Sequence, residues 1–360
     1  MYTWSRNAHL FIGHHTTGVA ATTPNIDSAY NHGSSGDAFC VKFVSPVTQS
    51  SATLKFCAYV MAVTGTPDFQ MHVRNGAVSP GDVDRPEASG SAISSSPSTV
   101  SMSGADAGTW VEFTCTVSLT AGVTYWVLVT NTSGAPISNY ATFRYSGTIQ
   151  FANFSSSERE AAVTVYTTNG FSADGTTNTN GTANTFVLKF ADGTYLGNPY
   201  VTSSTPASAA EDRGIRFVPL EDLIVSGICF GINALTSIDS LGIYEGSTTI
   251  FEQALSSLYS TINDHMTVRF APVRLKAGHT YDVMRRSVTA LTHPTLYEMG
   301  EVEASVPADV LACRPPGWAY VSGSGPGSYT ADTSKTVRCL LWADLALNLR
   351  HGWNKRGNKQ

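Results

Sequence analysis

The sequence predicts an all-β protein built from two tandem β-sandwiches of the jelly-roll or Greek-key type. Charged residues make up only 14% of the 360 residues, whereas Ser and Thr together number 82. This composition is typical of β-structure and unlike helical or disordered chains. Short apolar runs alternate with Gly, Ser, Asn and Pro clusters, and their period is two residues. A third observation is that several segments recur in the same order along the chain.

The clearest recurrence is a nine-residue segment in which six positions are identical. Residues 117–125 read Val-Ser-Leu-Thr-Ala-Gly-Val-Thr-Tyr, and residues 273–281 read Val-Arg-Leu-Lys-Ala-Gly-His-Thr-Tyr. Three further matches pair residues 41–44 with 215–218, 54–60 with 224–232, and 186–192 with 338–344. Because the order is preserved, we infer that one domain was duplicated within the chain.

The repeated Leu-x-Ala-Gly-x-Thr-Tyr resembles the tyrosine corner of Greek-key sandwiches. In that motif a glycine makes the tight turn, and a tyrosine hydroxyl bonds to backbone slightly upstream. The residues that carry the motif are Leu119, Gly122 and Tyr125 in the first copy, and Leu275, Gly278 and Tyr281 in the second. We expect a structural role for both tyrosines; a tyrosine in a binding site is the alternative.

Domain boundaries follow from the repeat. Residues 1–35 form an N-terminal arm or lead strand, 36–197 the first sandwich, 198–345 the second, and 346–360 a basic C-terminal tail. The junction is marked by turn-forming and polar residues around Pro199 and Pro206.

Charge limits the classes of partner. The net charge of −5 gives no reason for the body of the protein to bind nucleic acid. The tail is the exception, with four basic residues, Arg350, Lys355, Arg356 and Lys359. We interpret it either as a solvated chain end or as an arm that docks on an acidic neighbouring subunit.

Export and membrane signals are not found in the sequence. The first ten residues lack a basic region followed by an apolar one, and no stretch approaches the roughly 18 apolar residues needed to span a bilayer. Synthesis in a cytoplasm without a signal peptide is therefore expected. The six cysteines are dispersed, and we expect buried thiols rather than disulfides or metal ligands: Cys40, Cys57, Cys115, Cys229, Cys313 and Cys339.

The sequence carries no familiar catalytic or metal-binding motif. The chain contains no Gly-x-Ser-x-Gly, Walker, His-Glu-x-x-His or Cys-x-x-Cys pattern. The oxygen-rich loops 81–87 and 174–181 do not fit a calcium-binding pattern and are better explained as solvated turns. Acidic pairs at 158/160 and 301/303 are better explained as exposed strand charges than as glycosidase carboxylates. We therefore predict a non-enzymatic protein with no catalytic residue, bound metal or cofactor.

Aromatic residues offer the one candidate binding surface. Trp126 and Trp342 lie in repeated strands and are expected in the core. Trp318 and Tyr320 precede a Gly/Ser-rich loop, so their rings are candidates for stacking on sugars.

Taken together, the chain resembles the β-sandwich accessory proteins of tailed bacteriophages, of the head-decoration or the minor tail and fibre class. The resemblance is carried by Leu-x-Ala-Gly-x-Thr-Tyr and by the loop-flanked strands around Phe186 and Trp342. It implies a structural component of the virion, made in the host cytoplasm, whose partners are other virion proteins and copies of itself in a homo-oligomer. The alternative is a glycan- or receptor-binding module at a particle or cell surface; a hydrolase ranks third.

Overall fold

The structure is a computed structural model, and it describes most of the two repeated segments. The described residues are 10–14, 20–22, 38–75, 92–148, 167–170, 182–198, 205–209, 211–220, 222–231, 240–254, 265–286, 291–298, 307–313, 317–333, 335–337 and 339–345.

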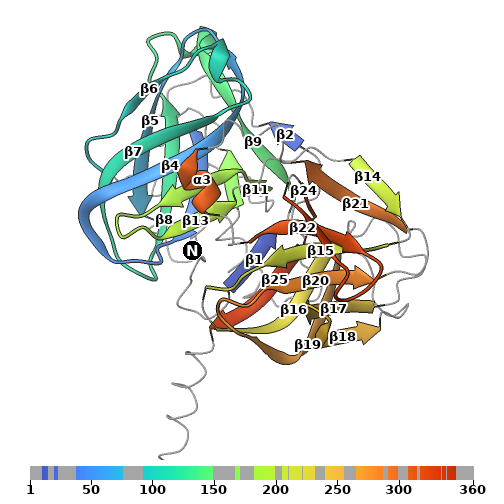
Figure 1. Cartoon of the computed structure of the whole chain (residues 1–360). Coiled ribbons are helices and arrows are strands. Elements are labelled where there is room, and N and C mark those ends of the chain that lie inside the picture. The colour runs from blue at the N-terminus through green and yellow to red at the C-terminus, as the bar shows by residue number, and fades with distance from the viewer. Residues whose placement is uncertain are drawn as a thin grey trace, which may run out of the picture.

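The chain folds as an all-β protein in two units, drawn mainly in blue to green and in yellow to red; the blue strand of residues 10–14 lies in the second unit, and the orange helix of residues 308–312 lies on the first (Figure 1). The first unit contains β2 (Ala20–Thr22), β3 (Ala38–Val44), β4 (Gln49–Thr64), β5 (Asp68–Asn75), β6 (Thr99–Ser101), β7 (Trp110–Leu119), β8 (Thr124–Asn131), β9 (Tyr140–Thr148), β10 (Thr167–Gly170), β11 (Thr182–Asn184), β12 (Phe186–Lys189) and β13 (Tyr195–Asn198). Two 3-10 turns, η1 (Gly104–Asp106) and η2 (Pro136–Ser138), lie in its loops.

The second unit contains β1 (Leu10–His14), β14 (Thr205–Ala209), β15 (Asp212–Phe217), β16 (Leu223–Gly231), β17 (Ser240–Glu245), β18 (Thr248–Ala254), β19 (His265–Leu275), β20 (Tyr281–Arg286), β21 (Leu291–Glu298), β22 (Ala319–Gly323), β23 (Thr330–Asp332), β24 (Lys335–Val337) and β25 (Cys339–Leu345). The short helix α3 (Ala308–Ala312) lies between β21 and β22 in the sequence.

Ten strands of each unit follow the same order; the others differ, since β9 links β11 to β4 in the first unit whereas β14, β21 and β24 form a separate three-stranded sheet in the second. One sheet runs β6-β5-β8-β3-β10-β11 in the first unit and β18-β17-β20-β15-β22-β23 in the second. The opposing sheet runs β13-β12-β4-β7 in the first unit and β1-β25-β16-β19 in the second. In the first unit β4 also pairs with β9 beyond a bulge between Val60 and Ala62, which joins the two sheets at one corner. Common ancestry of the units stays a prediction, although they share this order of ten strands.

Strand register corrects one of the four sequence matches. Matching 186–192 with 338–344 aligns Leu188 with Leu340. The structure instead places Leu188 opposite Phe56, and Leu341 opposite Ile228. Leu188 and Leu341 are the side chains that point into their cores. The two strands therefore correspond with a shift of one residue, because alternation along a strand fixes which side chain faces inward.

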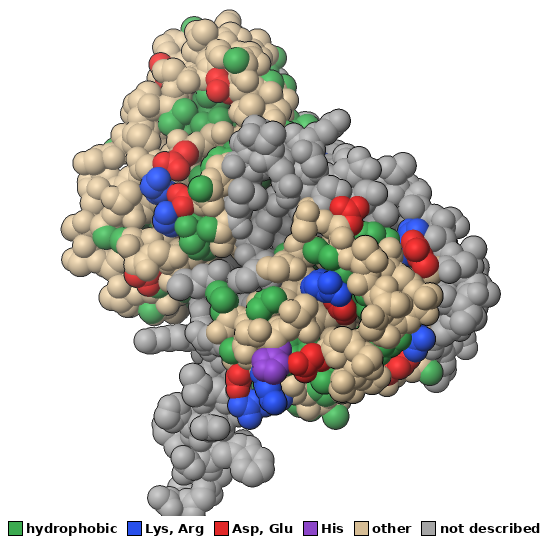
Figure 2. Space-filling view, viewed as in Figure 1, with side chains coloured by type: hydrophobic (Ala, Val, Ile, Leu, Met, Phe, Trp, Pro, Cys, Tyr) green, Lys and Arg blue, Asp and Glu red, His purple; other side chains and the backbone are tan. Residues whose placement is uncertain are grey.

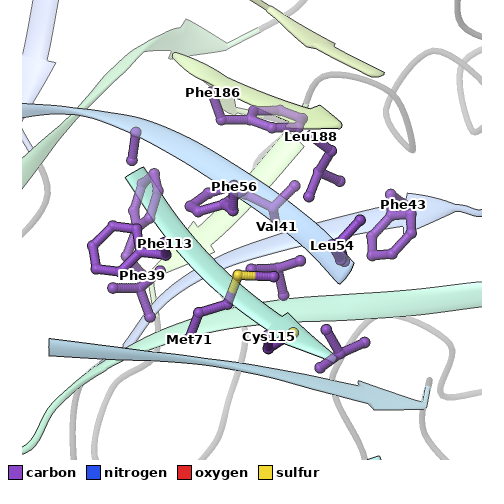
Figure 3. Close-up of a cluster of buried hydrophobic side chains, with 14 of the residues drawn as sticks. Phe39, Val41, Phe43, Leu54, Phe56, Met71, Phe113, Cys115, Phe186 and Leu188 are labelled. Carbon is purple, nitrogen blue, oxygen red and sulfur yellow. The ribbon is translucent and has the colours of Figure 1, made fainter. Parts of the chain in front are cut away.

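The core of the first unit lies between its two sheets and is dominated by phenylalanines (Figure 3). Phe39 stacks on Phe143 with ring centroids 4.7 Å apart, and Phe56 stacks on Phe186 at 5.9 Å. Burying each such ring stabilises the fold by roughly 1.5–3 kcal/mol. The inward residues of β3, β4, β7 and β12 supply most of this cluster, as their alternating pattern predicts.

The second unit has its own core, and β25 separates it from the first. Leu341 and Ala343 point into the second core, whereas Trp342 points the other way and packs in the buried cluster of the first unit. The guanidinium of Arg269 on β19 lies 4.8 Å from the centroid of the Trp342 ring. Trp342 is thus buried, as the sequence predicted, but as a contact between the units.

Candidate functional site

The two tyrosine motifs form the same hydrogen bonds in both units. The hydroxyl of Tyr125 accepts a hydrogen bond from the backbone N–H of Thr120 at 2.9 Å. The hydroxyl of Tyr281 accepts one from the backbone N–H of Lys276, also at 2.9 Å. Each tyrosine stands opposite a phenylalanine of the neighbouring strand, Phe43 or Phe217. Both tyrosines are buried, so their surroundings are structural rather than those of an open binding site.

The glycines of the motif make the turns that aim these tyrosines. Gly122 has φ 81° and Gly278 has φ 75°, a region that favours glycine. The N–H of Gly122 donates to the carbonyl of Ser45, and that of Gly278 donates to the carbonyl of Pro219, both at 2.8 Å. The preceding leucines are the remaining motif residues, and Leu119 and Leu275 lie in the two cores.

Trp318 and Tyr320, the candidates for stacking on sugars, are buried. Each has only 7% of its surface exposed, and both rings pack in the core of the second unit. The reason is strand pairing, because Tyr320 on β22 stands opposite the buried Ile215 on β15. These rings therefore offer no face to a sugar. The basic residues Arg350, Lys355, Arg356 and Lys359 of the tail lie outside the described residues.

The best-defined charged cluster joins the two units. Helix α3 belongs to the second half of the sequence but packs on the first unit (Figure 1). Its Val310 and the following Cys313 bury their side chains against Cys57, Trp110 and Val187, on the outer face of the β4–β7–β12 sheet. Beside this apolar contact, Figure 2 shows a compact group of acidic and basic side chains on a surface with few other charges.

Asp309 is the centre of this charged group. Lys55 on β4 and Lys189 on β12 are directly opposite each other in the sheet, an arrangement of like charges that destabilises strand pairing. The Asp309 carboxylate lies between them, 2.6 Å from the Nζ of Lys189 and 3.6 Å from that of Lys55. The hydroxyl of Tyr195 donates a third contact to it at 2.8 Å. Lys55 also pairs with Glu112 on β7 at 2.9 Å, so helix α3 supplies the counter-charge chiefly for Lys189.

Electrostatics agree with this geometry. Burial alone would raise the pKa of Asp309, but hydrogen bonds from Lys189 and Tyr195 outweigh it and hold the pKa below its usual range. The hydrogen bond to Asp309 raises the pKa of Lys189. Asp309 and Lys189 therefore stay charged near neutral pH. Sequence reasoning missed this cluster, although an acidic residue at the start of a short apolar turn, Asp309-Val310-x-x-Cys313, was a weak signal for it.

A second polar cluster holds the strands of the second unit together. Arg286 donates to Asp212 at 3.1 Å and to Glu252 at 3.0 Å, and the hydroxyl of Tyr329 donates to Asp212 at 2.9 Å. Burial would raise the pKa of Glu252, but hydrogen bonds from Ser240 and Arg286 outweigh it and lower the pKa. A general acid needs the opposite shift, so Glu252 is suited to ion pairing rather than proton donation.

Five cysteines of the described part are buried and lie outside any disulfide: Cys40, Cys57, Cys115, Cys313 and Cys339. Burial raises the pKa of Cys57 and that of Cys115, each to about 12. These two thiols stay protonated near neutral pH, a state that is poorly nucleophilic and does not bind metal. Among the described residues, moreover, no group of three or more His, Cys, Asp or Glu side chains is placed to hold a metal ion.

The N-terminal strand makes the other connection between the units. β1 pairs with β25 over five residues, from Leu10 opposite Ala343 to His14 opposite Cys339. β2, which follows it in the sequence, pairs instead with β9 of the first unit. The segment predicted as one arm, 1–35, therefore contributes strands to both units.

Comparisons with known proteins give little guidance. No family model and no curated protein matches the chain. Two solved structures of a lectin from Pleurotus ostreatus are similar at 9% identity over 92% of this chain. The form in complex with GalNAc is covered over 86% of its length with a TM-score of 0.22, and the apo form over 94% with a TM-score of 0.21. A likeness at this TM-score carries no argument about ligand or function. Within the described residues, no helix has the length and apolar character needed to cross a membrane.

Proposed function

We propose that this protein is a non-enzymatic structural subunit of a bacteriophage particle that assembles through contacts with its neighbours. The observation that supports this most is β1, a strand near the chain end that fills a sheet edge of the distant second unit. Strand addition to a sheet edge is a common means of joining subunits, because the backbone ladder supplies the binding energy.

The use of charge supports the same proposal. The Asp309 and Arg286 clusters hold strands and a helix in place by ion pairs and hydrogen bonds. Uncharged side chains cover most of the described surface in Figure 2, and the other charged side chains gather in small groups of both signs. Surfaces of this kind associate through shape and apolar contact at about 25 cal/mol per Å² buried, before the cost of association is subtracted.

Co-sedimentation tests the proposal. Full-length protein should co-sediment with phage particles from cells that produce both, and it should show no glycosidase or esterase turnover. Deleting residues 350–360 should reduce incorporation without unfolding the two units. Robust turnover that one Glu or Ser substitution abolishes would refute the structural proposal. Binding of the free protein to a defined glycan, without incorporation into particles, would favour the alternative of a glycan-binding module.

A further inference from the structure

The two units close one sheet edge in different ways. In the first unit, β12 turns back on itself as β13, so the strand beside β12 is its immediate successor in the sequence. In the second unit the strand beside β25 is β1, which lies more than 300 residues away in the sequence. The equivalent sheet edge is therefore covered by β13, the next strand in the sequence, in the first unit and by the distant β1 in the second.

The sequence after β25 does not repeat the turn that follows β12. The β12–β13 turn needs Gly193, whose φ is 86°. In this turn the N–H of Gly193 donates to the carbonyl of Phe190 at 3.0 Å, and the N–H of Thr194 donates to the Asp192 carboxylate at 2.9 Å. After β25 the first glycine is Gly352, seven residues beyond Leu345, whereas Gly193 is four residues beyond Lys189. A side chain in the left-handed region costs roughly 1–2 kcal/mol.

A short connector attaches β1 to the first unit, and this connector sets how far β1 can reach towards a neighbouring copy. Only residues 15–19 connect it to β2, which belongs to the first unit. An extended connector of this length reaches about 20 Å. The ladder that β1 forms on β25 uses backbone groups, and those groups are identical in every copy of the chain. A β1 from an adjacent copy can therefore make the same bonds, provided that the donor's first unit replaces the acceptor's own first unit against Trp342.

We propose that the β25 edge is an acceptor site for β1 of a second copy of this chain, and that copies are linked by exchanged N-terminal strands. The inference rests on the proposed function, since it assumes an assembly made of copies. Within one chain, the tether gives β1 a high effective concentration, which opposes exchange; crowding of copies in a particle raises the competing concentration of β1 strands from other chains.

A native cysteine makes the exchange measurable. His14 stands opposite Cys339 in the antiparallel register. Opposed residues of such strands have Cα atoms about 4.5–5.5 Å apart, which is within the range of a disulfide. In the full-length variant His14→Cys, diamide oxidises the two thiols to a disulfide, and the diamide takes up their two electrons and two protons. Leu10→Cys is the matched control, because Leu10 stands opposite Ala343.

Unlabelled and ¹⁵N-labelled His14→Cys chains are mixed in equal amounts, unfolded, refolded together at high concentration and oxidised. Exchange predicts disulfide-linked dimers or higher species by non-reducing electrophoresis. It also predicts that up to about half of the 14–339 linked peptides join a light chain to a heavy one. The control should give neither product.

Two results would overturn the inference. One is a 14–339 link that stays within single chains at every concentration, including in isolated particles. The other is the absence of any 14–339 link, which would remove β1 from this edge altogether. The disulfide between positions 14 and 339 is measured on purified protein. A negative result there is therefore distinct from a failure of the protein to co-sediment with particles, which would count against the proposed function.

Discussion

The two units share the order of ten strands and the same tyrosine turns, but they differ at their sheet edges. The turn bonds agree closely, with the tyrosine hydroxyl contacts at 2.9 Å and the glycine contacts at 2.8 Å in both. The edges beside β12 and β25 are instead filled by strands of different origin, β13 and β1. The comparison indicates that the inward-facing side chains of the strands and their turns specify the fold. The edge strands can differ between the units without changing it.

The largest expected effect comes from the two cores. Phe56 and Ile228 hold equivalent inward positions on β4 and β16, opposite Leu188 and Leu341. Phe56→Ala should cost about 3–5 kcal/mol and Ile228→Ala about 2–5 kcal/mol, because each leaves a cavity in a separate core. Hydrogen exchange measured by mass spectrometry should show lost protection in the substituted unit first. Equal loss in both units from either change would mean that they share one core.

The tyrosine hydroxyls should give the next largest effect. Tyr125→Phe and Tyr281→Phe each remove the acceptor of one backbone N–H while keeping the ring in place. Each change should lower the free energy of unfolding by about 1–2 kcal/mol, measured by chemical denaturation. Because the two bonds have the same length and burial class, the losses should agree. A large loss in only one unit would show that the motif stabilises the units unequally.

The turn glycines should give a smaller, matched effect. Gly122→Ala and Gly278→Ala place a side chain at a positive φ, and no atom lies within 4 Å of a Cβ built at Gly278. The cost is then conformational, at about 1 kcal/mol each. Gly104→Ala is the control, because Gly104 has open space and no positive φ. A control variant as unstable as the other two would contradict this account.

The framework could be predicted from sequence because it depends on local signals. Period-two alternation, turn glycines and the repeated motif are all short-range, and they indicated the all-β class and the turns around Gly122 and Gly278. The position of Trp318 could not be predicted from short-range signals. The Gly/Ser-rich loop after it suggested an exposed ring, but Trp318 packs in the second core, next to the point where β22 begins to pair with β15.

The contacts between the units could not be predicted for a related reason. β1 pairs with β25 because the sheet edge at β25 has no other described strand beside it. The residues around Leu10–His14 carry no local pattern from which that distant edge could be predicted. The docking of α3 likewise depends on two lysines that become neighbours only when β4 and β12 pair. Matching residues 186–192 to 338–344 by identity was off by one for the same reason, since only pairing fixes the inward face.

The smallest expected effect concerns Asp309, and it tests whether charge holds α3 in place. Asp309→Asn removes the counter-charge between Lys55 and Lys189, both about one-third exposed, so the loss should stay below about 1 kcal/mol. Locally the change should be clear, because loosening α3 uncovers the buried Cys313. A thiol reagent at neutral pH should therefore label Cys313 faster in Asp309→Asn than in the unsubstituted protein. Asp222→Asn, which removes a carboxylate paired with Arg274 in the second unit, is the control and should leave that rate unchanged.

Acidification should act in the same direction as Asp309→Asn. The pKa of Asp309 is lowered in the folded state, so its contribution is complete above the ordinary aspartate value of about 3.9. It is lost as the pH falls further, through the folded pKa, because a neutral carboxyl no longer separates the two lysines. Hydrogen exchange of residues 307–313, corrected for its intrinsic pH dependence, should be constant from pH 7 to about 4 and rise below that. A rise already between pH 7 and 5 would show that a titrating group other than Asp309 controls the contact, and the absence of a rise below pH 4 would mean that α3 is held mainly by Val310 and Cys313 in their apolar site.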